Sequence, residues 1–306
     1  YEGLYYMAKI KDFYNRNQDA FHEISPEKLW QAYADDFYRM DTYYRKFQQA
    51  FQKSLNNPLF RLDDGIKAVA KRAEGIYQHW FLDKLLANWC NIAGNMLETR
   101  GYIPQLPQQK DFYRDNIRDA KTKMFVIISD AMRYEVAKEL SEDLVREMQC
   151  KVEMRNMEGI FPTITPFGMA ALLPKEEMEL EAGNGTVTVL DDGEPTGANY
   201  REKVLRKANP ASVVLKYEEL IQLRRDERKA KVKGMEVIYI YHDRIDAAGH
   251  GSGHDVFTAC DEAIDEVKNL VRIIVNDFSG VNILITSDHG FIYTYDAFTE
   301  ADKVEK

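Results

Sequence analysis

Carboxylate and imidazole side chains follow three separate apolar stretches of the chain. They are Asp130 at the end of KMFVIISD, Asp246 and His250 after EVIYIYHD, and Asp288 and His289 after VNILITS. Carboxylate and imidazole ligands suit zinc or manganese better than calcium. If the three stretches are parallel strands, their carboxyl ends lie at one edge of a sheet, where ligands bind. The two Asp–His pairs therefore predict a centre that holds two divalent metal ions.

The spacing within each pair decides how it can reach an ion. Neighbouring residues on a strand point to opposite faces, so Asp288 and His289 can share an ion only if the backbone leaves the strand there. Gly290 gives the backbone the freedom for that turn. Asp246 and His250 are separated by three residues, which places both on one face of a helix or closes a small chelate in a loop. Taken singly, each motif is also typical of an ordinary cap or turn.

A candidate nucleophile lies between the first two clusters. In GIFPTITPFGMAALLP, Thr165 precedes Pro166, and PFGMAALL is typical of a helix. We expect Thr165 at the N-cap or first position of that helix, where backbone N–H groups favour an anion. A threonine hydroxyl becomes an effective nucleophile when metal coordination lowers its pKa. Thr163 is the alternative residue, and a simple helix cap is the alternative role.

Strands and helices must alternate to position these residues. Apolar runs bounded by polar residues predict strands at 123–130, 150–157, 236–243 and 281–287. Helical periodicity predicts helices at 131–148 and within 255–275. This alternation indicates an α/β fold with a parallel sheet and helices on both faces.

The first hundred residues have many aromatic residues and few β-branched runs. Ser25 is a plausible N-cap and Pro26 a good first helical residue, so the stretch 25–55 reads as one long amphipathic helix. A second amphipathic helix is expected at about 65–97, and GYIPQLPQQKDF is typical of a linker or a long connection. We therefore predict an aromatic-rich helical region at 1–110 and an α/β domain at 111–306.

Composition limits the classes of protein that fit. No run of about 18 apolar residues occurs, so we expect no membrane segment. The net charge of −9 disfavours a broad basic surface for nucleic acid. The basic stretch 224–233 either contacts a phosphate backbone or forms a solvated helix face. Three scattered cysteines fit free thiols in the cytoplasm, and the start at Tyr1 indicates a fragment.

The order of the motifs resembles that of the alkaline phosphatase superfamily. More narrowly, VIISDAMRYE, FPTITPFGMAALLP, IYIYHDRIDAAGH and ILITSDHGF are similar to the PglZ domain, in the type A form of BREX type 1 phage-defence systems. The resemblance runs from Lys123 to the end of the chain, and the helices before it resemble the segment that precedes this domain. It implies an alkaline-phosphatase-like, mostly parallel sheet with helices on both faces, preceded by an all-helical region.

The resemblance also implies a role for each candidate residue. Asp130, Asp288 and His289 would hold one ion, Asp246 and His250 the other, and Thr165 would be the nucleophile. The implied reaction is in-line attack of the Thr165 alkoxide on phosphorus, followed by hydrolysis of the phospho-enzyme, with zinc or manganese stabilising the charge. The superfamily adds a histidine from later in the chain, but none follows His289. We expect a truncation at the C-terminus, with His254 as the alternative ligand.

Together these features predict a metal-dependent phosphate-ester hydrolase of a phage-defence system. The ester is a monoester or a diester, and a diester would make the protein a phosphodiesterase with nuclease-like activity on nucleic acid. A sulfatase is disfavoured because such enzymes use a modified cysteine or serine in a Cys/Ser-x-Pro-x-Arg context. The alternative is a catalytically weak structural or docking subunit that binds other BREX-type proteins through the helical region.

Three further residues are candidates for supporting roles. Arg133 can clamp a phosphate oxygen. His242 and Asp243 precede the Asp246 motif and can orient the metal ligands. Residues 191–203 are expected to form an inserted loop that covers the site.

Overall fold

The computed structural model describes residues 1–55, 64–148, 150–183, 186–250 and 256–294. Contacts divide the chain into two compact units. One unit is Leu106–Phe291, and the other is Tyr1–Gln105 with the residues from Ile292 onward. Each unit buries its own apolar side chains.

In the unit that contains Tyr1–Gln105, every regular element of the described residues is a helix. Its elements are α1 (Glu2–Arg16), α2 (Pro26–Ala32), η1 (Tyr33–Phe37), α3 (Tyr38–Leu55), α4 (Asp64–Ile76), η2 (Tyr77–Leu82) and α5 (Asp83–Arg100). Ser25 caps α2, because its Oγ accepts a hydrogen bond from Lys28 N at 3.4 Å. The two long predicted helices are present, but each contains a π-helical turn, η1 or η2, that the periodicity does not predict.

Aromatic side chains fill the core of this unit. Tyr44 and Tyr77 are fully buried and stack with ring centroids 3.7 Å apart. The buried carboxylate of Asp41 accepts hydrogen bonds from Tyr33 Oη at 2.7 Å and Tyr77 Oη at 2.6 Å. These phenols thus bury their rings while their hydroxyls keep partners. Within the described residues, no helix has both the length and the apolar character that crossing a membrane requires.

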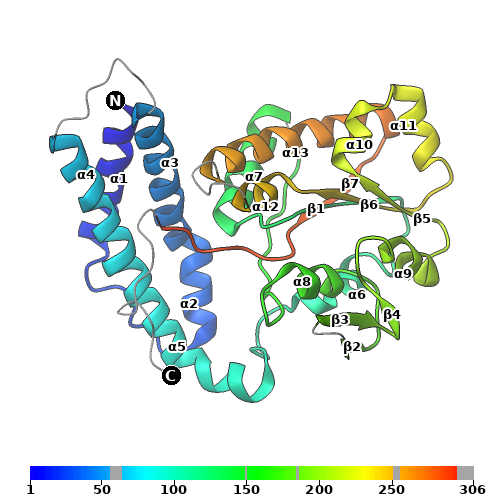
Figure 1. The fold of residues 1–306 in the computed structure, drawn as a ribbon, viewed down its shortest axis with the longest axis horizontal. Helices are drawn as coiled ribbons and strands as arrows, with labels where there is room; N and C mark the ends of the chain where they lie inside the picture. The colour runs from blue at the N-terminus through cyan, green and yellow to red at the C-terminus, as the bar shows by residue number, and fades with distance from the viewer. Residues whose placement is uncertain (56–63, 149, 184–185, 251–255, 295–306) are drawn as a thin grey trace. The chain divides into compact units, whose positions relative to one another are not determined.

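A four-stranded sheet with the order β5-β6-β1-β7 forms the centre of the second unit (Figure 1). All neighbouring strands are parallel, and their bounds are β1 (Met124–Ser129), β5 (Ser212–Lys216), β6 (Val237–His242) and β7 (Asn282–Thr286). Strands β6, β1 and β7 are the three predicted strands that precede candidate ligands. Ile127 of β1 is in register with Ile240 and Ile285, so the carboxyl ends of the three strands meet at one edge.

Helices cover both faces of this sheet. In Figure 1, α7 (Tyr134–Met148) and α13 (Val256–Phe278) lie on one face, with α6 (Phe112–Asn116), α8 (Thr165–Ala171) and α9 (Arg201–Ala208) on the other. Successive side chains of β1 point to opposite faces of the sheet: Val126 packs in a cluster with Met169 of α8, and Phe125 stacks on Phe278 of α13. The predicted fold class, a mostly parallel α/β domain after an all-helical region, is therefore confirmed.

Smaller elements complete the unit. They are η3 (Gln109–Asp111), α10 (Tyr217–Gln222), α11 (Arg225–Val232), α12 (Arg244–Gly249), and a three-stranded antiparallel sheet of β2 (Met178–Gly183), β3 (Thr186–Asp191) and β4 (Glu194–Pro195). The basic stretch 224–233 forms α11, where Arg225 and Arg228 both pair with Asp277 of α13 at 3.1 Å. Two of its cations therefore hold α11 against its neighbour.

Two expectations about this unit are wrong. Residues 150–157 form no strand, because their side chains are only half-buried or exposed and the nearest pairing is an isolated bridge of Gln108 with Glu158. Alternating polarity alone does not make a strand where a segment finds no strand to pair with. Residues 191–203 are not simply a loop, because they contain the end of β3, all of β4 and the start of α9.

Candidate metal centre

The candidate ligands lie where three neighbouring strands end. Asp130 directly follows β1, Asp243 directly follows β6, and Asp288 is two residues beyond β7. Because β1 lies between β6 and β7, Asp130 occupies the middle of this edge. The parallel sheet thus brings together residues more than 150 positions apart, as the sequence predicts.

Asp130, Asp288 and His289 form the first cluster. One potential ligand atom from each lies within 4.8 Å of the other two. His289 Nε2 is 3.7 Å from Asp130 Oδ1 and 3.5 Å from Asp288 Oδ2. The other oxygen of Asp288 accepts a hydrogen bond from Ala131 N at 3.1 Å, which fixes the carboxylate.

Thr165 joins this cluster through His289. It occupies the first position of α8, and its Oγ1 is 3.0 Å from His289 Nε2. The other ring nitrogen, Nδ1, is 2.9 Å from the carbonyl oxygen of Gly290, which can only accept. Nδ1 therefore carries the ring proton, and the lone pair of Nε2 accepts from Thr165 here and would bind a metal ion in place of that hydrogen bond. The rival threonine, Thr163, is exposed.

Asp130 also belongs to a second cluster, with Asp243 and Asp246. Asp246 lies on α12, and His250 caps the end of that helix with Nε2 3.2 Å from Asp246 Oδ2. The spacing of this pair is therefore helical rather than that of a loop. His250 is 81% exposed, so its imidazole lies at the open side of the cluster. His254 lies outside the described residues.

Asp243 is a candidate ligand that the sequence suggests only as a supporting group. It occupies the N-cap position of α12, yet its side chain makes no capping hydrogen bond. Its carboxylate instead contributes to the cluster with Asp130 and Asp246. The available signal was two acidic positions close to one strand end, but a capping aspartate gives the same pattern.

The electrostatics of the centre fit a divalent cation. Burial, followed by the charges of Asp288, Asp246 and Asp243, raises the pKa of Asp130 to about 8. Burial also raises the pKa values of Asp288 and Asp243. Among the described residues, Asp130 Oδ1 and Asp288 Oδ2 are buried and have no hydrogen-bond partner. Carboxylates that converge without donors are stable when a cation neutralises them, so these residues fit bound metal ions.

His242 supports the centre without joining either cluster. It is buried, with Nδ1 2.9 Å from Ser129 Oγ and Nε2 2.7 Å from Glu266 Oε2. Burial alone would raise the pKa of Glu266, but hydrogen bonds from His242 and Arg244 lower it to about 2. This network joins the last residues of β1 and β6, directly before Asp130 and Asp243.

Two residues that the sequence alone does not indicate as functional hold the loop after β7 in place. Gly168 of α8 packs so closely that a Cβ atom there would lie 2.3 Å from Asp288 O. Gln109 Nε2 donates to the same carbonyl oxygen at 2.6 Å.

Arg133 has a buried side chain 5.4 Å from the ring centroid of Phe291 and 4.0 Å from Glu135 Oε1. These contacts hold the side chain in place, and its role as a phosphate clamp stays a prediction.

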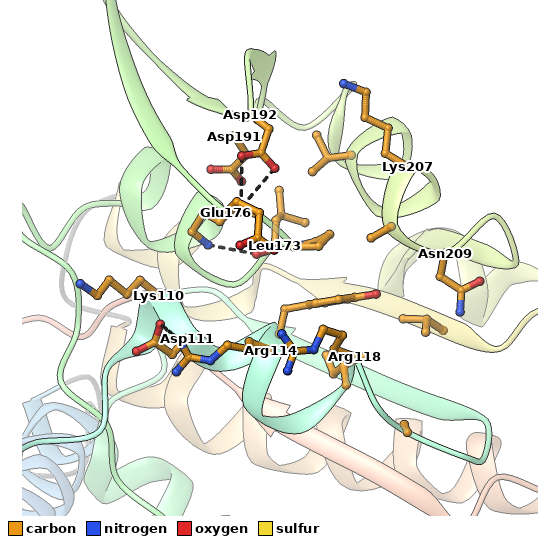
Figure 2. Close-up of a pocket in the computed structure, with 18 of the residues that line it drawn as sticks. Lys110, Asp111, Arg114, Arg118, Leu173, Glu176, Asp191, Asp192, Lys207 and Asn209 are labelled. Atoms are coloured by element: carbon orange, nitrogen blue, oxygen red, sulfur yellow. Dashed lines mark hydrogen bonds and ion pairs between the residues drawn. The ribbon is translucent and has the colours of Figure 1, made fainter.

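A separate cavity of about 910 Å³ lies against the first residues of β1 and β6, at the edge opposite the candidate centre (Figure 2). Figure 2 shows charged residues on its walls, several of which pair with one another. Arg114 is 2.9 Å from Asp111, and Asp192 accepts a hydrogen bond from Glu176 N at 3.1 Å. None of the candidate ligands lines this cavity, so it is not part of the centre.

The chain is similar to a family of known proteins. Residues 110–306 match the family model of the BREX system PglZ alkaline phosphatase-like domain. The chain is 32% identical over 313 residues to the alkaline phosphatase-like protein BrxZ of Escherichia coli O9:H4 (strain HS), which covers 99% of this chain and 35% of the relative. It is 34% identical over 311 residues to the alkaline phosphatase-like protein PglZ of Bacillus cereus (strain H3081.97), which covers 100% of this chain and 36% of the relative. The chain thus spans about a third of the length of these relatives.

Proposed function

The chain belongs to the family of BREX PglZ alkaline phosphatase-like domains, and from that premise we propose that it hydrolyses phosphate esters with Thr165 as the nucleophile. The observation that carries the proposal is the contact of Thr165 Oγ1 with His289 Nε2 at 3.0 Å, beside two buried carboxylate oxygens without partners. A nucleophile, a metal-binding imidazole and uncompensated negative charge within one small volume are what a metal-dependent phosphoryl transfer needs.

Two sets of residues would hold the ions. Asp130, Asp288 and His289 form one set, and Asp130, Asp243 and Asp246, with His250 beside them, form the other. Bound there, zinc or manganese would neutralise the carboxylates, lower the pKa of the Thr165 hydroxyl and stabilise negative charge on the phosphoryl group. The carboxylates of the second set favour manganese over zinc.

The residues of the chain have distinct tasks in this reaction. The first turn of α8 presents Thr165 beside His289 Nε2. Thr165 Oγ1 loses its proton to water and attacks phosphorus in line with the ester oxygen; the P–O ester bond breaks, and the leaving oxygen takes a proton from water and departs as the alcohol. Water then attacks the phosphothreonine, the bond from phosphorus to Oγ1 breaks, Oγ1 regains a proton, and phosphate is released from a monoester or a phosphate monoester from a diester. The Gly290 carbonyl keeps the His289 tautomer that the first step needs.

The substrate is a phosphate monoester or diester, and a diester would make the protein a phosphodiesterase with nuclease-like activity. We infer that the reaction serves a phage-defence system in the cytoplasm, with other BREX-type proteins as partners, and the match to the BREX family model supports this inference.

Substitution of the nucleophile tests this proposal. Thr165→Ala and the matched control Thr163→Ala should be assayed in the intact protein with aryl phosphate monoesters and diesters, with Mn²⁺ or Zn²⁺ added. We expect Thr165→Ala to lose at least about 1,000-fold in kcat, because covalent catalysis needs the hydroxyl. Thr163→Ala should keep wild-type turnover, since its side chain is exposed. Equal turnover in the wild type and Thr165→Ala would end the assignment.

A second candidate is a structural or docking subunit with weak activity. Exposed apolar side chains of the helical unit, among them Leu4, Tyr5 and Ile24, favour this role. Metal content discriminates between the two functions. A purified intact protein that binds neither Mn²⁺ nor Zn²⁺ and turns over no ester is the docking subunit rather than the hydrolase.

A further inference from the structure

Gln109 connects two segments of the candidate centre, the loop after β7 and the stretch that leads to Thr165. Its side chain is only 3% exposed. Nε2 donates hydrogen bonds to Asp288 O at 2.6 Å and to Ser287 O at 3.1 Å, both in the loop after β7. Oε1 accepts a hydrogen bond from Ile160 N at 3.1 Å, in the segment that leads to Thr165. One side chain therefore joins the loop that carries Asp288 and His289 to the segment that carries the nucleophile.

The chemistry of the amide explains why this position holds glutamine. An amide group has two N–H donors and one carbonyl acceptor, and Gln109 meets two carbonyl oxygens with the former and one N–H group with the latter. Glutamate keeps the acceptor but loses both donors. Methionine, of similar length, loses all three hydrogen bonds.

Neighbouring contacts leave the loop little room to shift in other directions. Gly168 of α8 lies against the carbonyl of Asp288. Ser287 Oγ donates to His289 O at 2.7 Å, and the backbone N–H of Gln109 donates to Glu158 O at 2.9 Å. Gln109 thus acts from a segment that is itself fixed to the chain before Thr165.

We propose that Gln109 is a positioning residue that sets the distance between the Asp288–His289 ligand pair and Thr165. Its effect on turnover rests on the proposed function, whereas its effect on the two loops does not. Residues that orient metal ligands typically change metal affinity or activity about 10- to 100-fold when they are replaced. We expect Gln109 to act in this range, through the backbone of Asp288 rather than through a side-chain ligand.

Two variants of the intact protein separate the roles of the amide, and Gln105→Glu serves as the control because Gln105 is exposed. Gln109→Glu retains the acceptor for Ile160 N, and Gln109→Met does not. Amide hydrogen exchange without added metal should therefore become at least about tenfold faster at Ile160 in Gln109→Met only. Mn²⁺ affinity, measured by chelator competition, should fall about 10- to 100-fold in both variants and stay unchanged in Gln105→Glu.

Turnover gives a third measurement that a general loss of stability would not reproduce. In both Gln109 variants kcat should fall at least tenfold at saturating Mn²⁺, while KM for an aryl phosphate changes less than threefold. Mn²⁺ affinity within twofold of the wild type in folded Gln109→Met, with Ile160 exchange unchanged, would overturn the inference. If the wild type hydrolyses no ester, the proposed function fails, but hydrogen exchange and Mn²⁺ affinity still decide the role of Gln109. If Gln109→Glu does not fold, Gln109→Met provides the decision.

Discussion

Replacing Gly168 with alanine tests whether close packing of α8 on the ligand loop sets the geometry of the centre. A Cβ atom at this position would lie 2.3 Å from Asp288 O, 2.7 Å from Asp288 C and 3.0 Å from Asp288 Cβ. Two of these atoms belong to the backbone, and no flexible side-chain end can yield. Helix α8 or the loop must therefore move by about 0.7 Å before the shortest contact reaches 3.0 Å. Such overpacking costs about 1–3 kcal/mol of unfolding free energy.

The displacement also separates Thr165 from His289, because α8 carries one and the loop the other. A misplacement of about 1 Å can cost about 100-fold in rate, so we expect Gly168→Ala to lower kcat by about 10- to 100-fold. Urea unfolding and aryl phosphate turnover with saturating Mn²⁺ measure the two effects. Gly94→Ala is the matched control, since a Cβ atom there meets nothing within 4 Å in the middle of α5, and alanine should stabilise that helix by up to about 1 kcal/mol. If Gly168→Ala keeps wild-type stability and a kcat within twofold of the wild type, close packing does not set this geometry.

Two further predictions concern pH and the attachment of α8. Because the folded-state pKa of Asp130 is about 8, well above its unfolded value of about 4, the folded metal-free protein retains a proton that the unfolded chain releases. Thermal unfolding without metal should therefore show stability falling as pH rises from about 4 to 8. Asp130→Asn should remove most of this dependence on pH. An unchanged dependence in Asp130→Asn would show that the raised pKa of Asp130 is not its cause. Lys175→Met should cost about 3 kcal/mol in urea unfolding, because Lys175 Nζ donates to three carbonyl oxygens at the end of α8. These are Ala170 O (2.9 Å), Ala171 O (2.8 Å) and Leu173 O (3.0 Å), and a cost below about 0.5 kcal/mol would show that they are satisfied in another way.

The sequence predicts the frame of the centre because that frame depends on local patterns. Apolar runs of strand length end in polar residues, and parallel strands share an edge, so the convergence of Asp130, Asp246 and Asp288 follows without coordinates. Acidic residues within four positions of each strand end are then the natural candidate ligands. The position of Thr165 at the start of α8 follows from Pro166 in the same local way.

Contacts between distant segments could not be predicted by such rules. Gln109 lies in a stretch without helical or strand periodicity, and its partner Asp288 is 179 residues away. The need for glycine at position 168 comes from a loop elsewhere in the chain, so the local helix pattern does not indicate it. Residues 150–157 show the reverse error, since their alternation fits a strand but the fold provides no strand to pair with them.

The candidate centre holds buried carboxylates close together, and contacts around it keep the segments that carry them in place. Burial raises the pKa values of Asp130 and Asp288, and the neighbouring carboxylates raise that of Asp130 further, so without a cation these carboxylates reduce the stability of the fold. The surrounding contacts oppose the relaxation that would relieve this repulsion: Gln109 and Gly168 hold the loop after β7, and His242 ties β1 to β6. A metal ion that binds only the folded state, at a free concentration of 100 times its Kd, would stabilise that state by about 2.7 kcal/mol. The protein therefore sets the geometry, and a bound ion would compensate its electrostatic cost, which is the arrangement that the proposed phosphoryl transfer requires.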